Sequence, residues 1–335
     1  MSVGILGLGI YLPQTMMTAA DIAQATQGVW TEDAVIEKLG IRQIYRPGPD
    51  DGTQAMAVRA SQEALKDAGI EGSEIDLILS IGEEWKERPL TTTAMVIQGA
   101  IEAVNAWGID LQNRCSTGLS AIKIAKDMMT ADASLKTVLI AGGYRNGDLI
   151  DFSDPASSFM YNLSSGGGAL ILRQGLNRNL VLGSHIVSDG SLAHSVGVQS
   201  GGTLEPDTTN NFYLKVFEAE KMKAKLNAVS MNNWFSCLDH ALIKSQKTRE
   251  DIDYLNILHI KRSGHRMILD TLNLSADQTV YLEDYGHLGQ IDQILSLKLG
   301  LDSGKIQDGS VVAMLAAGVG YVWAASIIQW GPYHG

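Results

Sequence analysis

An internal repeat, with a spacing of about half the chain, constrains the fold more than any other feature of this sequence. Three pairs of segments match: Ala64-Leu65 with Ala241-Leu242, Ile75-Asp76 with Ile252-Asp253, and Ala141-Gly142 with Ala317-Gly318. The first two pairs are 177 residues apart (241 − 64 and 252 − 75), and the third pair is 176 residues apart. Helix–loop–strand units that match at one spacing indicate a duplicated fold. Chance similarity between two α/β units is the alternative.

Apolar runs typical of buried strands alternate along the chain with segments typical of helices, which argues for α/β layers. We expect strands at Ile5–Leu8, Leu77–Ile81, Val138–Ala141, Leu180–Leu182, Leu255–Leu258 and Val311–Leu315. We expect helices at Asp21–Ala25, Met56–Ala68, Leu119–Met129, Phe217–Ser245 and Ile291–Leu299. No Ser/Pro/Gly-rich linker separates residues 1–175 from residues 176–335, so these two halves are expected to pack together.

Composition excludes several classes of protein. The formal net charge is −11, and nucleic-acid binding needs a basic face that neutralises phosphates. No apolar run reaches the roughly 18–20 residues of a membrane span, no signal peptide pattern opens the chain, and no metal-binding spacing occurs. Cys115 and Cys237 are the two cysteines, which is too few for a disulfide framework. We therefore expect reduced thiols and a cytoplasmic protein without a bound metal.

Cys115 is the first candidate for chemistry. It follows the extended run Trp107–Asn113 and precedes a segment that we expect to be helical. A thiol at a helix N-terminus faces unpaired N–H groups and the positive end of the helix dipole, and both favour the reactive thiolate. The alternative is a small buried apolar residue, which is the usual role of an isolated cysteine.

The chain resembles the ketoacyl-acyl-carrier-protein synthases III of the thiolase superfamily over nearly its whole length. The resemblance depends on the order of these motifs: Gly7–Pro13 with Thr18 and Asp21-Ile22, Gly40-Ile41-Arg42 with Arg46, Asp110 five residues before Cys115, and Gly318–Trp323. It implies a five-layer αβαβα thiolase-like fold made of two duplicated halves, which agrees with the repeat. The family is usually homodimeric, so a homodimer is expected.

The same resemblance assigns catalytic roles. The nucleophile of the family falls on Cys115, in the N-terminal half, and its catalytic histidine falls on His259, in the C-terminal half. The third residue of the family is usually Asn in a Gly-Asn pair, but here Gly286 is followed by His287. A Cys-His-His set resembles the chain-elongating ketoacyl synthases, in which two neutral imidazoles would donate to a thioester oxygen and stabilise an enolate. His287 as a turn residue is the alternative.

Glu84 is a second departure from the synthase III pattern. It falls where 3-hydroxy-3-methylglutaryl-CoA synthases have a catalytic Glu, and Cys115–Gly118 and Ser164–Gly168 also resemble archaeal members of that family. A carboxyl group in a partly apolar site acts as an acid or base when its pKa is raised. An exposed charge beside Lys86 is the alternative.

The resemblance implies an acyltransferase that needs no bound cofactor and uses coenzyme A thioesters as substrates, with an acyl carrier protein as a further partner. Cys115 would accept an acyl group, with the N–H groups of Cys115 and Val319 as oxyanion hole, and a malonyl-like thioester would then condense with it to a 3-oxoacyl product. Trp30 and Lys38 lie near the family's CoA clamp, and Lys215 opens a basic run suited to CoA phosphates, although such lysines commonly form a solvated helix face. The alternatives are non-decarboxylating condensation or thiolysis with Glu84 as base, and a non-catalytic partner subunit, which Arg114 next to the thiol favours.

Overall fold

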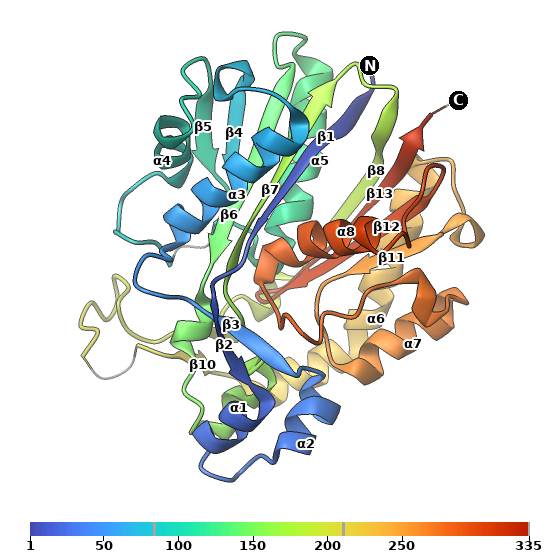
Figure 1. Cartoon of the computed structure of the whole chain (residues 1–335). Coiled ribbons are helices and arrows are strands. Elements are labelled where there is room, and N and C mark those ends of the chain that lie inside the picture. Colours follow the sequence, from blue (N-terminus) through green and yellow to red (C-terminus); the bar gives the residue numbers. More distant parts are fainter. Residues whose placement is uncertain (83–84, 210–211, 334–335) are drawn as a thin grey trace.

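A computed structural model describes residues 1–82, 85–209 and 212–333 of the chain. Among these residues, nine strands form one mixed sheet in the order β11-β12-β13-β8-β1-β7-β6-β4-β5 (Figure 1). Their bounds are β1 Val3–Tyr11, β4 Leu77–Ser80, β5 Trp107–Asp110, β6 Thr137–Tyr144, β7 Gly166–Gln174, β8 Arg178–Ser188, β11 Tyr254–Ile257, β12 Val311–Gly318 and β13 Val322–Pro332. The main helices are α3 Thr53–Ala68, α4 Thr93–Ala100, α5 Thr117–Ala131, α6 Ala219–Lys244, α7 Arg262–Leu272 and α8 Asp292–Asp302.

The strand pairing repeats on either side of the connection between β7 and β8. In the N-terminal half β4 pairs parallel with β6, β6 antiparallel with β7, and β7 antiparallel with β1. In the C-terminal half β11 pairs parallel with β12, β12 antiparallel with β13, and β13 antiparallel with β8. Strand β5, which lies parallel to β4, corresponds in the C-terminal half to an isolated parallel bridge between Leu255 and Thr279. The matched segments of the sequence repeat thus occupy corresponding places in the two halves.

The helices complete five layers, as the resemblance implied. Helix α3 covers one face of β1, β6 and β7, with α4 beside it against β4 and β5, and α6 covers β8, β12 and β13. Helices α5 and α8 lie between the halves, because each contacts strands of both. The two halves of the sheet meet at a single register pair between β1 and β8, Gly4 with Leu180. The apolar side chains of α5 and α8 therefore share one core with the C-terminal strands.

Smaller elements lie together at one end of the molecule. They are β2 Thr15–Thr18, β3 Gln43–Arg46, α1 Ala19–Ala25, α2 Glu32–Ala34, a π-helix at Val35–Leu39, β9 Val196–Val198 and β10 Leu214–Val216. They pack on a second apolar cluster around Ile44, Tyr161 and Leu288. None of the helices in the described part of the chain is long and apolar enough to cross a membrane.

Most predicted elements agree with the structure to within a few residues. Helix α5 begins at Thr117 rather than at Leu119, and α6 ends at Lys244, one residue before the predicted Ser245. The sequence patterns missed β7, β13, α4 and α7. Residues 318–323, which we expected to be a glycine loop, divide between the end of β12, a short turn and the start of β13.

Glycine in β1 permits the close packing of α3 on the N-terminal half of the sheet. A Cβ atom at Gly9 would lie 1.9 Å from the carbonyl oxygen of Ala60 and 2.6 Å from the amide nitrogen of Ala64. Backbone atoms of a helix cannot yield as a flexible side chain can, so any side chain at this position forces the helix away from the sheet.

We predict that Gly9→Ala destabilises the protein by about 1–3 kcal/mol or more, the usual cost of overpacking a core. Gly99→Ala is the matched control, because Gly99 is exposed on α4 with open space around its Cα. In a helix this substitution stabilises by about 1 kcal/mol. Urea denaturation followed by circular dichroism should give a lower midpoint for Gly9→Ala and an unchanged or higher one for Gly99→Ala. Equal midpoints would contradict the packing argument.

Candidate active site

Cys115 lies at the junction between β5 and α5. Strand β5 ends at Asp110, and a short 3-10 turn over Arg114–Ser116 leads directly into α5. The turn is held by the N–H of Asn113, which donates to Oγ1 of Thr117 at 2.7 Å. Arg114 has a φ of 51°, in the left-handed region, so the backbone bends sharply just before the thiol. Cys115 is partly exposed and faces a cavity from the N-terminus of α5, where the helix dipole favours a thiolate.

His287 faces the thiol directly. Its Nε2 lies 3.2 Å from Sγ of Cys115, and its Nδ1 lies 2.6 Å from Oδ2 of Asp292. Its backbone joins the two halves of the molecule, because its N–H donates to the carbonyl of Asn162 at 2.8 Å and its carbonyl accepts from Ser164 at 2.9 Å. His287 follows the turn at residues 283–285 and forms an isolated parallel bridge with Leu163, so it is not the turn residue of the alternative interpretation. Its ring forms the middle of a Cys–His–Asp chain.

Asp292, which sequence reasoning missed, is the third member of this chain. It is fully buried at the first residue of α8. Besides His287, its carboxylate accepts the N–H groups of Leu288 and His259, each at 2.7 Å. The signal in the sequence was a carboxylate five residues after His287, at the start of a predicted helix. Burial alone would lower the pKa of His287, but the carboxylate of Asp292 and the sulfur of Cys115 together raise it well above its ordinary value.

His259 lies directly after β11 and lines the same cavity, but its ring is bound in a different way. Its Nε2 lies 3.1 Å from the carbonyl oxygen of Gly40, and its Nδ1 lies 2.9 Å from Nδ2 of Asn162. Burial lowers its pKa to about 4, so the ring is neutral at physiological pH. The expectation that both histidines donate to a thioester oxygen as neutral imidazoles therefore differs from this geometry. Gly40 and Asn162 engage both nitrogens of His259, and Asp292 favours a charged His287.

The backbone around Gly318 approaches Cys115 closely. A Cβ atom at Gly318 would lie 3.0 Å from the amide nitrogen of Cys115 and 3.1 Å from the carbonyl oxygen of Asn113. A side chain here would be tightly packed against this backbone, and the segment that follows brings Val319 to the cavity wall. Cys115 and Val319, the pair predicted to form an oxyanion hole, thus line the same part of the cavity.

The cavity in front of Cys115 has a volume of about 960 Å³. Its wall is largely apolar and aromatic, with three cations near it, Lys86, Arg114 and Lys261. The Phe, Tyr and Trp side chains among its described lining residues are Trp85, Tyr144, Phe159, Phe212, Trp234 and Tyr321. This volume is at the upper end of the range for small-molecule sites, so it holds more than a short acyl group.

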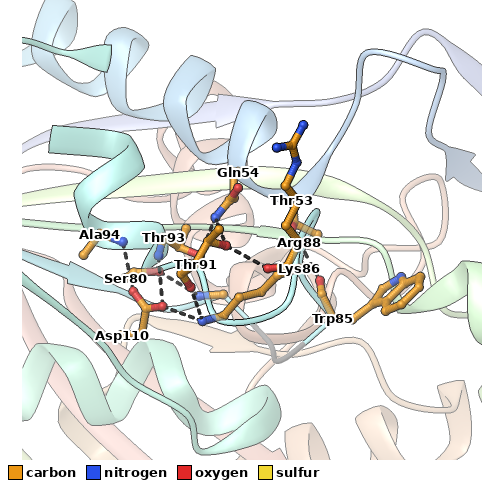
Figure 2. A network of polar contacts seen from close by, with 11 residues as sticks. Thr53, Gln54, Ser80, Trp85, Lys86, Arg88, Thr91, Thr93, Ala94 and Asp110 are labelled. Carbon is orange, nitrogen blue, oxygen red and sulfur yellow. Dashed lines mark hydrogen bonds and ion pairs between the residues drawn. The ribbon is translucent and has the colours of Figure 1, made fainter. Parts of the chain in front are cut away.

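A polar network fixes the segment that follows β4 beside this cavity (Figure 2). Nζ of Lys86 lies 2.7 Å from Oδ2 of Asp110 and 2.9 Å from the carbonyl of Thr91. The carboxylate of Asp110 also accepts the N–H groups of Thr93 and Ala94, at the start of α4. Asp110 therefore joins the strand before the nucleophile to the cavity wall. Glu84, proposed as an acid or base, lies outside the described residues.

The residues predicted to contact CoA lie elsewhere. Trp30 packs edge-on against Tyr161, with ring centroids 6.1 Å apart, and Lys38 is exposed on the π-helix. Nζ of Lys215 donates to Asp154 at 3.0 Å. None of these three occurs among the described residues that line the cavity at Cys115. Their role in CoA binding stays a prediction.

The remaining candidates for thiol or imidazole chemistry are buried in other places. Cys237 is buried within α6, and its burial raises the pKa of the thiol to about 11, which disfavours the thiolate. His265, the other histidine near β11, lies on α7 and is buried. Its Nε2 lies 3.4 Å from Oγ1 of Thr279.

Comparison with known proteins identifies the relatives of this chain. Residues 109–190 match the family model of 3-oxoacyl-[acyl-carrier-protein] synthase III, and residues 242–330 match the model of its C-terminal part. A β-ketoacyl-[acyl-carrier-protein] synthase III of Ehrlichia ruminantium is 27% identical, over 97% of this chain and 98% of its own length. One from Bacillus cereus is 28% identical, over 99% of this chain and all of its own.

Solved structures agree in fold. The priming β-ketosynthase of the R1128 polyketide pathway has a TM-score of 0.85 at 22% identity, covering 99% of this chain and 97% of its own. The 3-oxoacyl-[acyl-carrier-protein] synthase III of Aquifex aeolicus has a TM-score of 0.82 at 20% identity, covering 98% of this chain and all of its own. The two family models, which together match just over half of the chain, define an acyltransferase of the thiolase superfamily, and the fold agrees with this class. Within that superfamily, the chain belongs to the ketoacyl-acyl-carrier-protein synthase III family.

Asp292 should control the reactivity of the thiol through His287. A charged imidazolium beside sulfur stabilises the thiolate, and the Asp292 carboxylate stabilises that imidazolium. Asp292→Asn should therefore slow alkylation of Cys115 by iodoacetamide at pH 6–7 and shift the pH profile of alkylation upward, because the pKa of His287 falls without this carboxylate. Peptide mass spectrometry at Cys115 over a pH series measures this shift.

Asp110→Asn is the control for this measurement. It also removes a mostly buried carboxylate that accepts two backbone N–H groups, but its other partner is Lys86 rather than a histidine beside the thiol. Its alkylation profile should match that of the wild type. An unchanged profile in Asp292→Asn, or the same shift in both variants, would contradict the role given to Asp292.

Proposed function

We propose that this protein takes an acyl group from an acyl-CoA or acyl-carrier thioester onto Cys115 and passes it to a second substrate. The observation that supports this most is the chain of contacts from Sγ of Cys115 through His287 to Asp292. A nucleophile, a base within hydrogen-bond distance and a third group that orients the base are the general signature of covalent acyl transfer.

The first half-reaction follows from these contacts. His287 holds the proton of the Cys115 thiol, and the sulfur attacks the thioester carbonyl to give a tetrahedral intermediate. As this collapses, the bond to the departing sulfur breaks and His287 returns the proton to it. The products are acyl-Cys115 and the free thiol of the carrier. We propose the N–H groups of Cys115 and Val319, two residues that line the cavity, as the donors that hold the oxyanion.

Carbon–carbon condensation with a malonyl-like thioester is the second candidate, and family membership favours it, since the named relatives are β-ketoacyl synthases. A catalyst is favoured over a non-catalytic subunit, because His287 and Asp292 form a complete base for the thiol. Arg114 bends the backbone without moving Cys115 out of the cavity. CoA and an acyl carrier protein remain the proposed donors.

Acylation should occur on Cys115 alone. Incubation with a short acyl-CoA should add one acyl group, seen by intact mass spectrometry, and Cys115→Ala should abolish it. Cys237→Ala is the control, because burial keeps that thiol protonated and away from substrate. His287→Gln should slow acylation by about 10²-fold or more, the usual loss for a general base. An adduct on Cys237, or its persistence in Cys115→Ala, would refute the assignment.

We also propose that the chain forms a homodimer through the edge of β5. This strand ends the sheet (Figure 1), and Trp107 on it is 47% exposed. Further exposed apolar residues cluster in sequence around it, at Leu90, Met95, Val96 and Val104. An unpaired apolar edge of this kind favours pairing with another chain.

Trp107→Asp should convert the dimer to a monomer in analytical ultracentrifugation, because it places a charge in the apolar edge. Ile243→Asp is the matched control, since Ile243 is 72% exposed on α6, away from β5. A wild-type monomer, or equal dissociation of both variants, would contradict the proposed interface.

A further inference from the structure

The hydrogen bonds of His259 determine its tautomer. The carbonyl oxygen of Gly40 only accepts hydrogen bonds, so Nε2 of His259 must bear the proton. Since burial keeps the ring neutral, Nδ1 has no proton and accepts from the amide of Asn162. Both nitrogens are engaged, and no N–H of this ring is left to donate to a thioester oxygen.

An enolate formed by decarboxylation needs donors positioned on its oxygen, because the negative charge develops there. In this site the two histidines do not form such a pair. His259 donates to Gly40, and His287 is oriented toward Sγ of Cys115 by Asp292. The arrangement instead provides one strong base next to the sulfur that bears the acyl group.

His287 is free to act as this base once the acyl group is on Cys115. In the first half-reaction the thiol proton leaves with the carrier, so His287 becomes neutral and Nε2 no longer faces a proton donor on sulfur. A second group that approaches the acyl carbon next to Sγ comes within reach of Nε2. If that group is a hydroxyl or amine, Nε2 accepts its proton as it attacks.

The cavity has room for such a second molecule. Its volume of about 960 Å³ is enough for an acyl group together with another small organic molecule. Its wall contains the rings of Phe159, Phe212 and Trp234, which suit an acceptor with an apolar or aromatic body.

We infer that the acyl group on Cys115 is transferred to the hydroxyl or amine of a small, largely apolar acceptor, with His287 as the base. This inference rests on the acyl-Cys115 intermediate proposed above. The acceptor oxygen or nitrogen forms a bond to the acyl carbon while its proton moves to Nε2 of His287. The bond from the acyl carbon to Sγ then breaks, and His287 gives the proton to the sulfur. The ester or amide is released, and the thiol of Cys115 is regenerated.

The test uses isolated acyl-enzyme. The wild-type protein is incubated with an acyl-CoA, the excess donor is removed, and the acyl adduct is confirmed by intact mass spectrometry. If the proposed function is wrong, no adduct is seen at this stage. Loaded protein is then mixed with 2-phenylethanol, with 2-phenylethylamine or with malonyl-CoA. The loss of the acyl group and the products, ester, amide or 3-oxoacyl thioester with CO₂, are measured over time.

We expect the alcohol or the amine to discharge the acyl-enzyme at least about 10-fold faster than buffer and faster than malonyl-CoA does. The mass of the product distinguishes the two acceptors. His287→Gln, loaded by prolonged incubation, should lose this acceleration by about 10²-fold or more. His265→Gln is the matched control, because His265 is buried in α7 with Thr279 as partner, and it should behave as the wild type.

A pH series gives a second readout that does not depend on loading the His287 variant. Removing the Asp292 carboxylate lowers the pKa of His287, so the neutral base exists at lower pH. As the pH is lowered, the discharge rate of the Asp292→Asn acyl-enzyme should therefore begin to fall at a lower pH than that of the wild-type acyl-enzyme. The inference is overturned if malonyl-CoA discharges the acyl-enzyme faster with release of CO₂, if neither acceptor exceeds buffer, or if the pH profile does not move.

Discussion

The Asp292 carboxylate is the interaction on which the site depends. It accepts hydrogen bonds from His287, from the N–H of His259 and from the N–H of Leu288. One buried group thus sets the position of the loop after β11, the turn before α8 and the ring that faces Cys115. Burying a carboxylate without hydrogen-bond partners costs free energy, so these bonds also offset the cost of burying Asp292.

The duplicated fold explains why these residues meet. Cys115 comes from the N-terminal half, at the start of α5, while His259, His287 and Asp292 come from the C-terminal half. Both α5 and α8 lie in the layer between the two halves, and Cys115 and His287, which precede these helices, line the same cavity. The close approach of Gly318 to Cys115 and the backbone pairing of His287 with residues 162–164 fix the two halves across the site.

The sequence predicted the layered fold and the position of the nucleophile, because both have local signatures. The constant offset of 176–177 residues corresponds to real repetition of strand pairing, and Cys115 does precede a helix. Strand β7 was missed because it opens with Gly166–Gly168, which has low strand propensity. The structure shows why glycine stands there, since a Cβ at Gly167 would lie 2.3 Å from the carbonyl of Met56 in α3. The partners of His259 could not be predicted, because Gly40 is 219 residues away along the chain.

The two histidines show how environment gives one residue type opposite properties. Both histidines are buried and hydrogen-bonded to Asp292. His259 donates to this carboxylate from its backbone N–H, whereas His287 contacts it with Nδ1 of its ring. The ring of His259 instead meets a carbonyl and an amide, which add no charge, so desolvation dominates and its pKa falls to about 4. The ring of His287 meets a carboxylate and a sulfur, and their negative charge outweighs the same desolvation. The carboxylate of Asp292, five residues after His287, therefore makes this ring basic enough to take a proton from a thiol.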